Sequence, residues 1–100
     1  MKLRILSSAL NDLIAGREFY ERQAEGVGDY FLDSLFSDID SLSLFASIHR
    51  KVMRFHRLLS HRFTYAIYYK MDSDGSAIVY RVLDCRRDPA KTRRALKAAE

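Results

Sequence analysis

The chain has 100 residues, a net charge of +4 and a pI near 9.4. This length allows one domain with a hydrophobic core and leaves no room for a second domain of ordinary size. The only cysteine, Cys85, excludes an intramolecular disulfide framework, and no apolar run approaches the roughly 18 residues of a membrane helix. We therefore expect one cytoplasmic domain over residues 1–100, with no membrane partner.

The charge is divided unevenly along the chain. Residues 1–47 hold four Lys and Arg against eight Asp and Glu, whereas residues 48–100 hold thirteen against five. A basic half of this kind favours a polyanionic or acidic partner. The alternative is that the two halves neutralise each other within the fold, but the concentration of the excess favours a partner.

The first half of the chain predicts a short strand followed by two helices. "MKLRIL" alternates apolar and basic residues, which is typical of a strand with one buried face. Apolar residues then recur at helical spacing as far as Gly26, and again from Val27 to Phe45 or Ala46. The short glycine-containing connection between them predicts a helical hairpin.

From Val52 the apolar period changes to two, which predicts three strands. In "VMRFHRLLS" we expect Met53, Phe55 and Leu59 on the core face, and "HRFTYAIYYK" alternates in the same way. "SAIVYRVL" is apolar on both faces, which is typical of a strand inside a sheet. Pro89 ends this last strand region, and the tail, residues 90–100, predicts a short or frayed helix.

This order of elements predicts an α+β fold, in which a helical hairpin packs on one face of a small, mostly antiparallel sheet. The other face of the sheet would then be open. We expect that open face to carry a basic and aromatic set of side chains, namely Arg54, His56, Arg62, Tyr68, Lys70 and Arg81.

Four stretches together resemble the RelE/ParE superfamily of toxins from bacterial type II toxin–antitoxin systems. "SALNDLIAGREFYERQ" and "GVGDYFLDSLFSDIDSL" are similar to the two helices of that family, "HRFTYAIYY" to its R-F-P-Y strand motif, and "VYRVLDCRRDP" to its last strand and basic ending. The resemblance implies a β-α-α-β-β-β fold and a plasmid-stabilising growth inhibitor. It also implies a cognate acidic antitoxin as partner, in a homodimer or in a toxin–antitoxin hetero-oligomer.

The resemblance implies one of two targets. RelE-like members cut messenger RNA on the ribosome, whereas ParE-like members are associated with poisoning DNA gyrase. Ala66 stands where many members have arginine, and no aromatic residue follows Tyr80. These departures favour the ParE-like branch over a messenger RNA endonuclease. A binding module that has kept only the fold is the further alternative.

Each target implies its own candidate residues. RNA cleavage would need a base at the 2′-hydroxyl and cations around the phosphate, and the candidates for it are Arg54, His56, Arg62, Arg81 and Arg87. The candidates for target binding are the basic residues near the C-terminus, Arg81, Arg86, Arg87, Arg93 and Arg94. No His, Cys and carboxylate set has metal-ligand spacing, so we expect no metal and no cofactor.

The pair Arg86-Arg87 is either a solvated strand end or a contact with the target. If the last strand continues through it, alternation places the two side chains on opposite faces. Arg87 would then share the side of Arg81, and Arg86 would continue the face of Val82. We therefore expect Arg87 to be the functional member of the pair.

Overall fold

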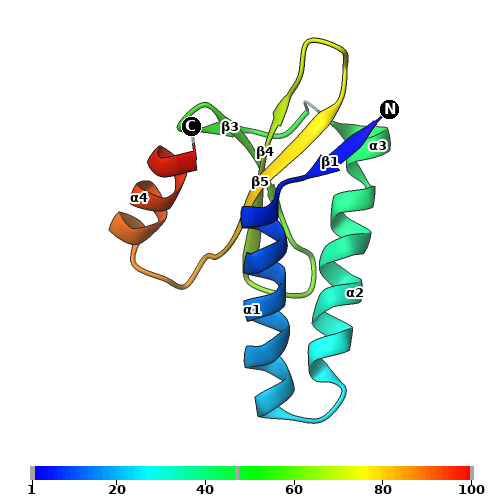
Figure 1. Ribbon diagram of the computed structural model, residues 1–100, viewed down its shortest axis with the longest axis vertical. Coiled ribbons are helices and arrows are strands. Elements are labelled where there is room, and N and C mark those ends of the chain that lie inside the picture. Colours follow the sequence, from blue (N-terminus) through cyan, green and yellow to red (C-terminus); the bar gives the residue numbers. More distant parts are fainter. Residues whose placement is uncertain (1, 47, 100) are drawn as a thin grey trace.

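The structure is a computed structural model that describes residues 2–46 and 48–99, and Figure 1 shows two long helices side by side next to a twisted sheet. Its elements are β1 (Leu3–Ile5), α1 (Ser7–Gln23), α2 (Val27–Asp40), α3 (Leu42–Phe45), β2 (Lys51–Val52), β3 (Phe55–Leu59), β4 (Tyr65–Met71), β5 (Ala77–Asp84) and α4 (Pro89–Ala99). Within the described ranges, no helix is both long enough and apolar enough to cross a membrane.

The five strands form one sheet in the order β1-β5-β4-β3-β2. β1 runs parallel to β5, and the other neighbours are antiparallel. "SAIVYRVL" is the inner strand β5, between β1 and β4, as its apolar residues on both faces predict. The predicted α+β class, with a helical hairpin on a mostly antiparallel sheet, is confirmed.

Small residues allow α1 and α2 to approach each other closely. A Cβ atom on Gly16 would lie 2.6 Å from the ring of Phe31, and one on Gly28 would lie 2.6 Å from the backbone oxygen of Arg17. The Glu21 carboxylate accepts a hydrogen bond from the N–H of Gly28 at 2.9 Å and so ties the end of α1 to the start of α2. The hairpin is therefore fixed at its closed end by contacts that larger residues would prevent.

The main core lies between this hairpin and one face of the sheet. Its buried members from the helices include Leu13, Phe31, Leu35 and Ile39, and those from the strands include Ile67, Tyr69, Val79 and Val82. Alternation along β4 and β5 sends every second side chain into this core. Each large apolar side chain buried there contributes about 1.5–3 kcal/mol.

A β-hairpin replaces the first strand that we predicted after the helices. Met53 and Arg54 have φ angles of 51° and 73°, so they form a tight turn between β2 and β3. Because the turn interrupts the alternation, Leu58 is buried at 7% exposure and Leu59 is 52% exposed, the reverse of our prediction. Two-residue hairpin turns with positive φ usually contain Asn or Gly, and "MR" gives no such signal.

The second predicted helix is divided at Ser41 into α2 and the short helix α3. The chain's tail forms the helix α4, and Pro89 is its first residue, where the missing N–H of proline costs nothing. The Asp88 carboxylate accepts the N–H of Ala90 at 2.9 Å and caps this helix. Glu100, the last residue of the predicted tail, lies outside the described residues.

The second face of the sheet is partly covered by α4 and is not open as we predicted. Leu96 of α4 is fully buried against Phe55 of β3, Tyr68 and Ala66 of β4, and Leu83 of β5. These strand residues alternate with those of the main core, so α4 and the α1–α2 hairpin lie on opposite faces. We did not predict this contact because α4 is short and rich in basic residues, and Leu96 is the one buried residue among those that the structure describes in it.

Candidate functional site

A hollow of about 320 Å³ lies between α4 and the second face of the sheet, and we call it the α4 groove. Three arginines from three elements line it: Arg57 from β3, Arg87 from the loop after β5, and Arg93 from α4. Tyr68 and Cys85 also line it. None of the described residues that line the α4 groove is acidic, so the groove favours an anionic ligand.

The other polar groups of the α4 groove are neutral at physiological pH. Burial raises the pKa of Tyr68, although a hydrogen bond from Arg57 to the phenol opposes the shift. Burial also raises the pKa of the Cys85 thiol. Neither group therefore supplies a negative charge that would neutralise the three guanidinium groups.

Arg86 and Arg87 lie beyond the end of β5 at Asp84, so the alternation argument does not apply to them. The Arg86 guanidinium donates to both carboxylate oxygens of Asp84, at 3.0 and 2.9 Å, and to the hydroxyl of Tyr20 at 3.1 Å. These bonds raise the pKa of Arg86 and lower that of Asp84. Arg87 makes no ion pair with any residue that the structure describes.

Arg81 is engaged by a carboxylate of α1. Its Nε and one terminal nitrogen donate to the two oxygens of Asp12 at 2.7 and 2.9 Å, and these bonds raise the pKa of Arg81. Asp12 also accepts the backbone N–H of Val82 at 2.9 Å. β1 ends before this part of β5, so the Asp12 carboxylate takes the place of the carbonyl that a neighbouring strand would offer.

His56 faces the main core and not the second face of the sheet, which corrects our prediction. Its ring stacks on that of Tyr69, with centroids 5.1 Å apart and an interplanar angle of 25°, and Tyr69 belongs to the main core. The tight turn before β3 sets this orientation. Lys70 lies on the opposite face, with its Nζ 4.6 Å from the centre of the Phe55 ring.

The structure therefore does not gather the five residues proposed for RNA cleavage at one place. Arg54 occupies the β2–β3 turn, Arg62 lies in the loop before β4 with its guanidinium 6.0 Å from the ring of Tyr30, and Arg87 lines the α4 groove. Of the residues proposed for target binding, Arg87 and Arg93 share the α4 groove. Arg94 lines a neighbouring hollow together with Met53, Ala90, Arg93 and Lys97.

Tyr65 provides a prediction about pH. Burial, helped by the nearby charge of Asp84, raises the pKa of its phenol to about 12 from 10.0. Because the folded state favours the neutral phenol, its contribution to stability is complete below pH 10 and is lost as the pH rises through 12. We expect Tyr65→Phe to reduce the alkaline loss of stability, measured by urea unfolding at about pH 8 and about pH 11.

Tyr30→Phe is the matched control, because Tyr30 is 52% exposed. An identical alkaline loss in the wild type and in Tyr65→Phe would contradict the prediction.

The similarity of this chain to known proteins lies in its fold. The sequence matches no family model and no curated protein. The structure is similar to a chain of the chromosomal ParDE TA system from P. aeruginosa, with a TM-score of 0.73 and 15% identity over 82% of this chain and 92% of that chain. It also aligns with the isolated E. coli RelE toxin, with a TM-score of 0.44 and 13% identity over 97% of each chain. The likeness to the ParDE chain confirms the RelE/ParE-like fold.

Proposed function

We propose that this protein is the toxin of a type II toxin–antitoxin system, a growth inhibitor of the ParE type that acts on DNA gyrase in the cytoplasm. The likeness of its fold to a chain of the ParDE system supports this proposal, at a TM-score of 0.73. The single feature of the chain itself that carries the proposal is the α4 groove, a hollow that Arg57, Arg87 and Arg93 line together and that none of the described acidic residues lines.

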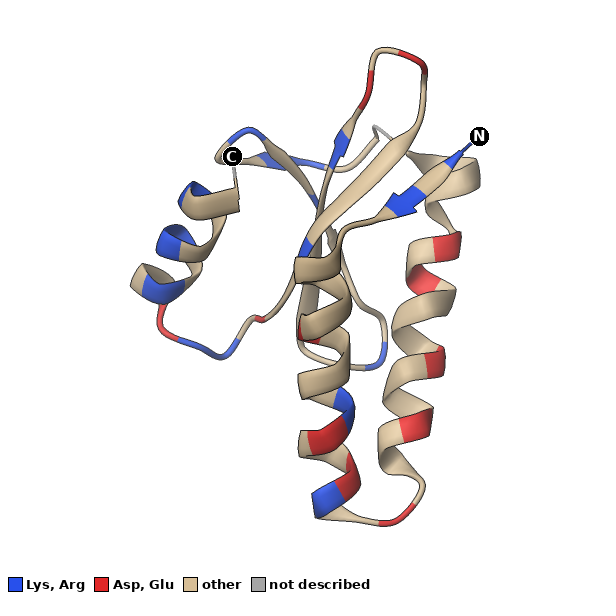
Figure 2. Cartoon of the chain, in the orientation of Figure 1, with Lys and Arg blue, Asp and Glu red and all other residues tan. Residues whose placement is uncertain are grey.

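The same groove supports a cognate antitoxin with an acidic, amphipathic segment. Arginines that make no ion pair favour carboxylates, and the apolar floor formed around Leu96 suits the apolar side of such a segment. An acidic segment that is disordered alone gains order when it binds. Figure 2 shows basic residues gathered on α4 and around β2 and β3, and acidic residues along α2.

The test is to express the chain with and without the product of the adjacent small reading frame. We expect growth arrest when the chain is expressed alone, rescue and co-purification when both are present, and inhibition of purified gyrase in a supercoiling assay. A chain that is harmless and unpartnered would refute the toxin proposal. A chain that binds the second product but never slows growth would identify a binding module instead.

Messenger RNA cleavage is not the activity that we propose. Ala66, which stands where many members of the resembled family, including nucleases, have arginine, is fully buried beside Leu83 and Leu96. A side chain at this position therefore lies under α4 and does not face a ligand. We expect primer extension after induction to show intact messages, and reproducible cuts linked to codons would overturn the ParE-like assignment.

A further inference from the structure

A second basic hollow lies outside the α4 groove, at the β2–β3 turn. Its volume is about 250 Å³, and it is lined by Lys51, Arg54, His56, Lys70 and Met71. We call it the turn site. Among the described residues, no carboxylate lies within ion-pairing distance of Lys51, Arg54 or Lys70. Three cations therefore surround one hollow without a counter-charge, which favours the binding of an anion there.

One cation of the turn site, Lys70, is held in place before any ligand binds. The Nζ of Lys70 lies 4.6 Å from the centre of the Phe55 ring and 5.3 Å from that of Tyr80, so two aromatic rings fix its position. Arg54 has a φ of 73°, a conformation that normally favours Gly or Asn. A charged residue in a strained backbone conformation is typical of a functional position.

His56 adds a hydrogen-bonding ring to the lining of the turn site. Its Nδ1 lies 2.8 Å from the backbone oxygen of His49. A carbonyl oxygen only accepts, so Nδ1 carries the hydrogen and Nε2 carries one only when the ring is protonated. Tyr69 stacks on the ring, Lys51 is its partner on the neighbouring strand, and His49 lies close to it. Lys70 lines the same hollow from the opposite face of the sheet.

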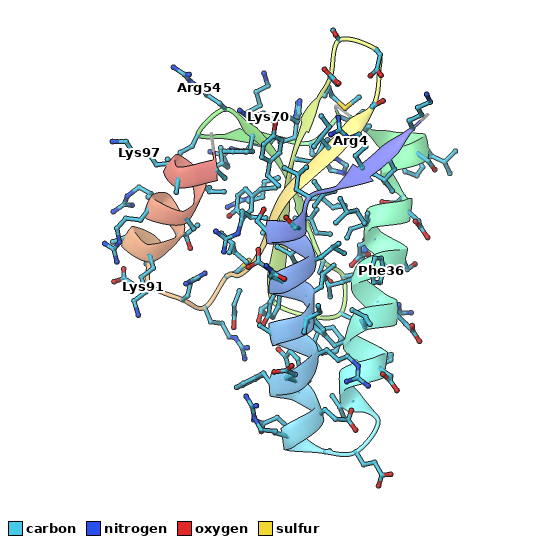
Figure 3. The ribbon with its side chains drawn as sticks, viewed as in Figure 1. Arg4, Phe36, Arg54, Lys70, Lys91 and Lys97 are labelled. Carbon is cyan, nitrogen blue, oxygen red and sulfur yellow. The ribbon has the colours of Figure 1, made fainter. Side chains whose placement is uncertain are left out.

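The basic surface continues away from the turn site across the sheet. Arg4 on β1 and Lys70 on β4 both pair with Ile78 of β5, so all three side chains point to the same face. In the view of Figure 3, Arg54, Lys70 and Arg4 follow one another across the upper part of the molecule. A band of separated cations matches a polymer with a regular series of phosphates better than it matches a single small ion.

We propose that the turn site binds a phosphate group of a nucleic-acid backbone, and that the band through Arg4 follows the next phosphates of the same strand. This contact lies outside the α4 groove and does not depend on the proposed toxin function. The three cations give affinity for phosphate and no reading of base sequence.

The test is the binding of labelled single-stranded DNA and RNA of about 12 nucleotides to the full chain, followed by fluorescence anisotropy at several salt concentrations. The double variant Lys51→Gln/Arg54→Gln should bind about tenfold more weakly, with a salt slope smaller by about 1.4, because two phosphate contacts are lost. The matched control is Arg22→Gln/Lys91→Gln, which removes two exposed charges elsewhere and should bind within about twofold of the wild type.

A further variant separates binding from folding. Glycine accepts a φ of 73° without strain, so Arg54→Gly should melt at the same or a higher temperature and still bind the oligonucleotides more weakly.

Four results would overturn the proposal. The first is an equal loss of oligonucleotide affinity in the two double variants, and the second is an unchanged affinity in Arg54→Gly. The third is stronger binding of a glutamate-rich peptide than of the oligonucleotides at the turn site. The fourth is competition by inorganic phosphate that is as effective, per phosphate group, as competition by an unlabelled oligonucleotide. The third result would assign the turn site to an acidic protein, and the fourth would assign it to a free phosphate.

Discussion

Replacing Asp12 by alanine is expected to lower the free energy of unfolding by about 2 to 4 kcal/mol. The substitution removes two hydrogen bonds from the Arg81 guanidinium and the carboxylate acceptor of the Val82 N–H. The side chains of Arg81 and Asp12 are 22% and 15% exposed, so water replaces the lost carboxylate only in part. The edge of β5 next to α1 would then hold an unsatisfied N–H and an uncompensated cation.

Urea unfolding of a small set of variants measures this effect and divides it. Asp12→Asn keeps an acceptor for the Val82 N–H and should cost less than Asp12→Ala. Arg81→Met removes the cation but leaves Asp12 bonded to Val82, so it should also cost less. The matched control is Asp29→Ala, whose partner is Arg17 and whose side chain is 67% exposed, with an expected cost below about 1 kcal/mol. If Asp12→Ala lowers the free energy of unfolding by no more than Asp29→Ala does, Asp12 does not stabilise the edge of β5.

The order of the elements could be predicted because apolar residues change their period once along the chain. Helical spacing runs through Leu13, Phe31 and Leu35, and spacing of two governs β4 and β5, whose alternate residues do enter opposite cores. The register of β3 could not be predicted. The turn at Met53 and Arg54 has neither glycine nor asparagine, and a missed turn exchanges the faces of the residues that follow it.

Of the arginines that line the α4 groove, only those near the C-terminus could be predicted, because the basic residues are concentrated there. Arg87 and Arg93 were expected at the basic C-terminal end, and both line the α4 groove. We did not predict Arg57 because it follows the unrecognised turn. The face of the sheet to which its side chain points could therefore not be inferred from alternation. The engagement of Arg81 has no local signal either, because its partner Asp12 is 69 residues away in sequence. Distant pairs of this kind are set by tertiary packing, which the period of the sequence does not describe.

Arg86→Ala and Arg87→Ala are expected to affect different properties of the protein. Arg86 already donates to both oxygens of Asp84, and its side chain is 55% exposed. Its loss should lower the free energy of unfolding by less than about 1 kcal/mol and leave growth inhibition intact. Because Arg86 holds the pKa of Asp84 below 3.8, its contribution is present above that pH and is lost as the pH falls through the depressed pKa. The stability difference between the wild type and Arg86→Ala should therefore disappear in acid.

Arg87 is the residue of the pair that remains available to a ligand. It lines the α4 groove and has no ion pair within the part of the chain that the structure describes. If its guanidinium makes a charge-assisted hydrogen bond to the target, Arg87→Ala should lose about 1.5 to 3 kcal/mol of binding, or roughly 10- to 150-fold in affinity. Its melting temperature should stay within the range of a surface substitution.

The measurement is growth inhibition by the wild type, Arg86→Ala and Arg87→Ala at equal expression, beside the thermal melting point of each. Arg93→Ala tests the same groove from α4 and should weaken inhibition in the same direction, since both guanidiniums face the hollow. Arg22→Ala, an exposed charge at the far end of α1, is the control for net charge alone. Equal inhibition by all of these proteins would show that Arg87 is a solvated residue and that the α4 groove does not contact the target.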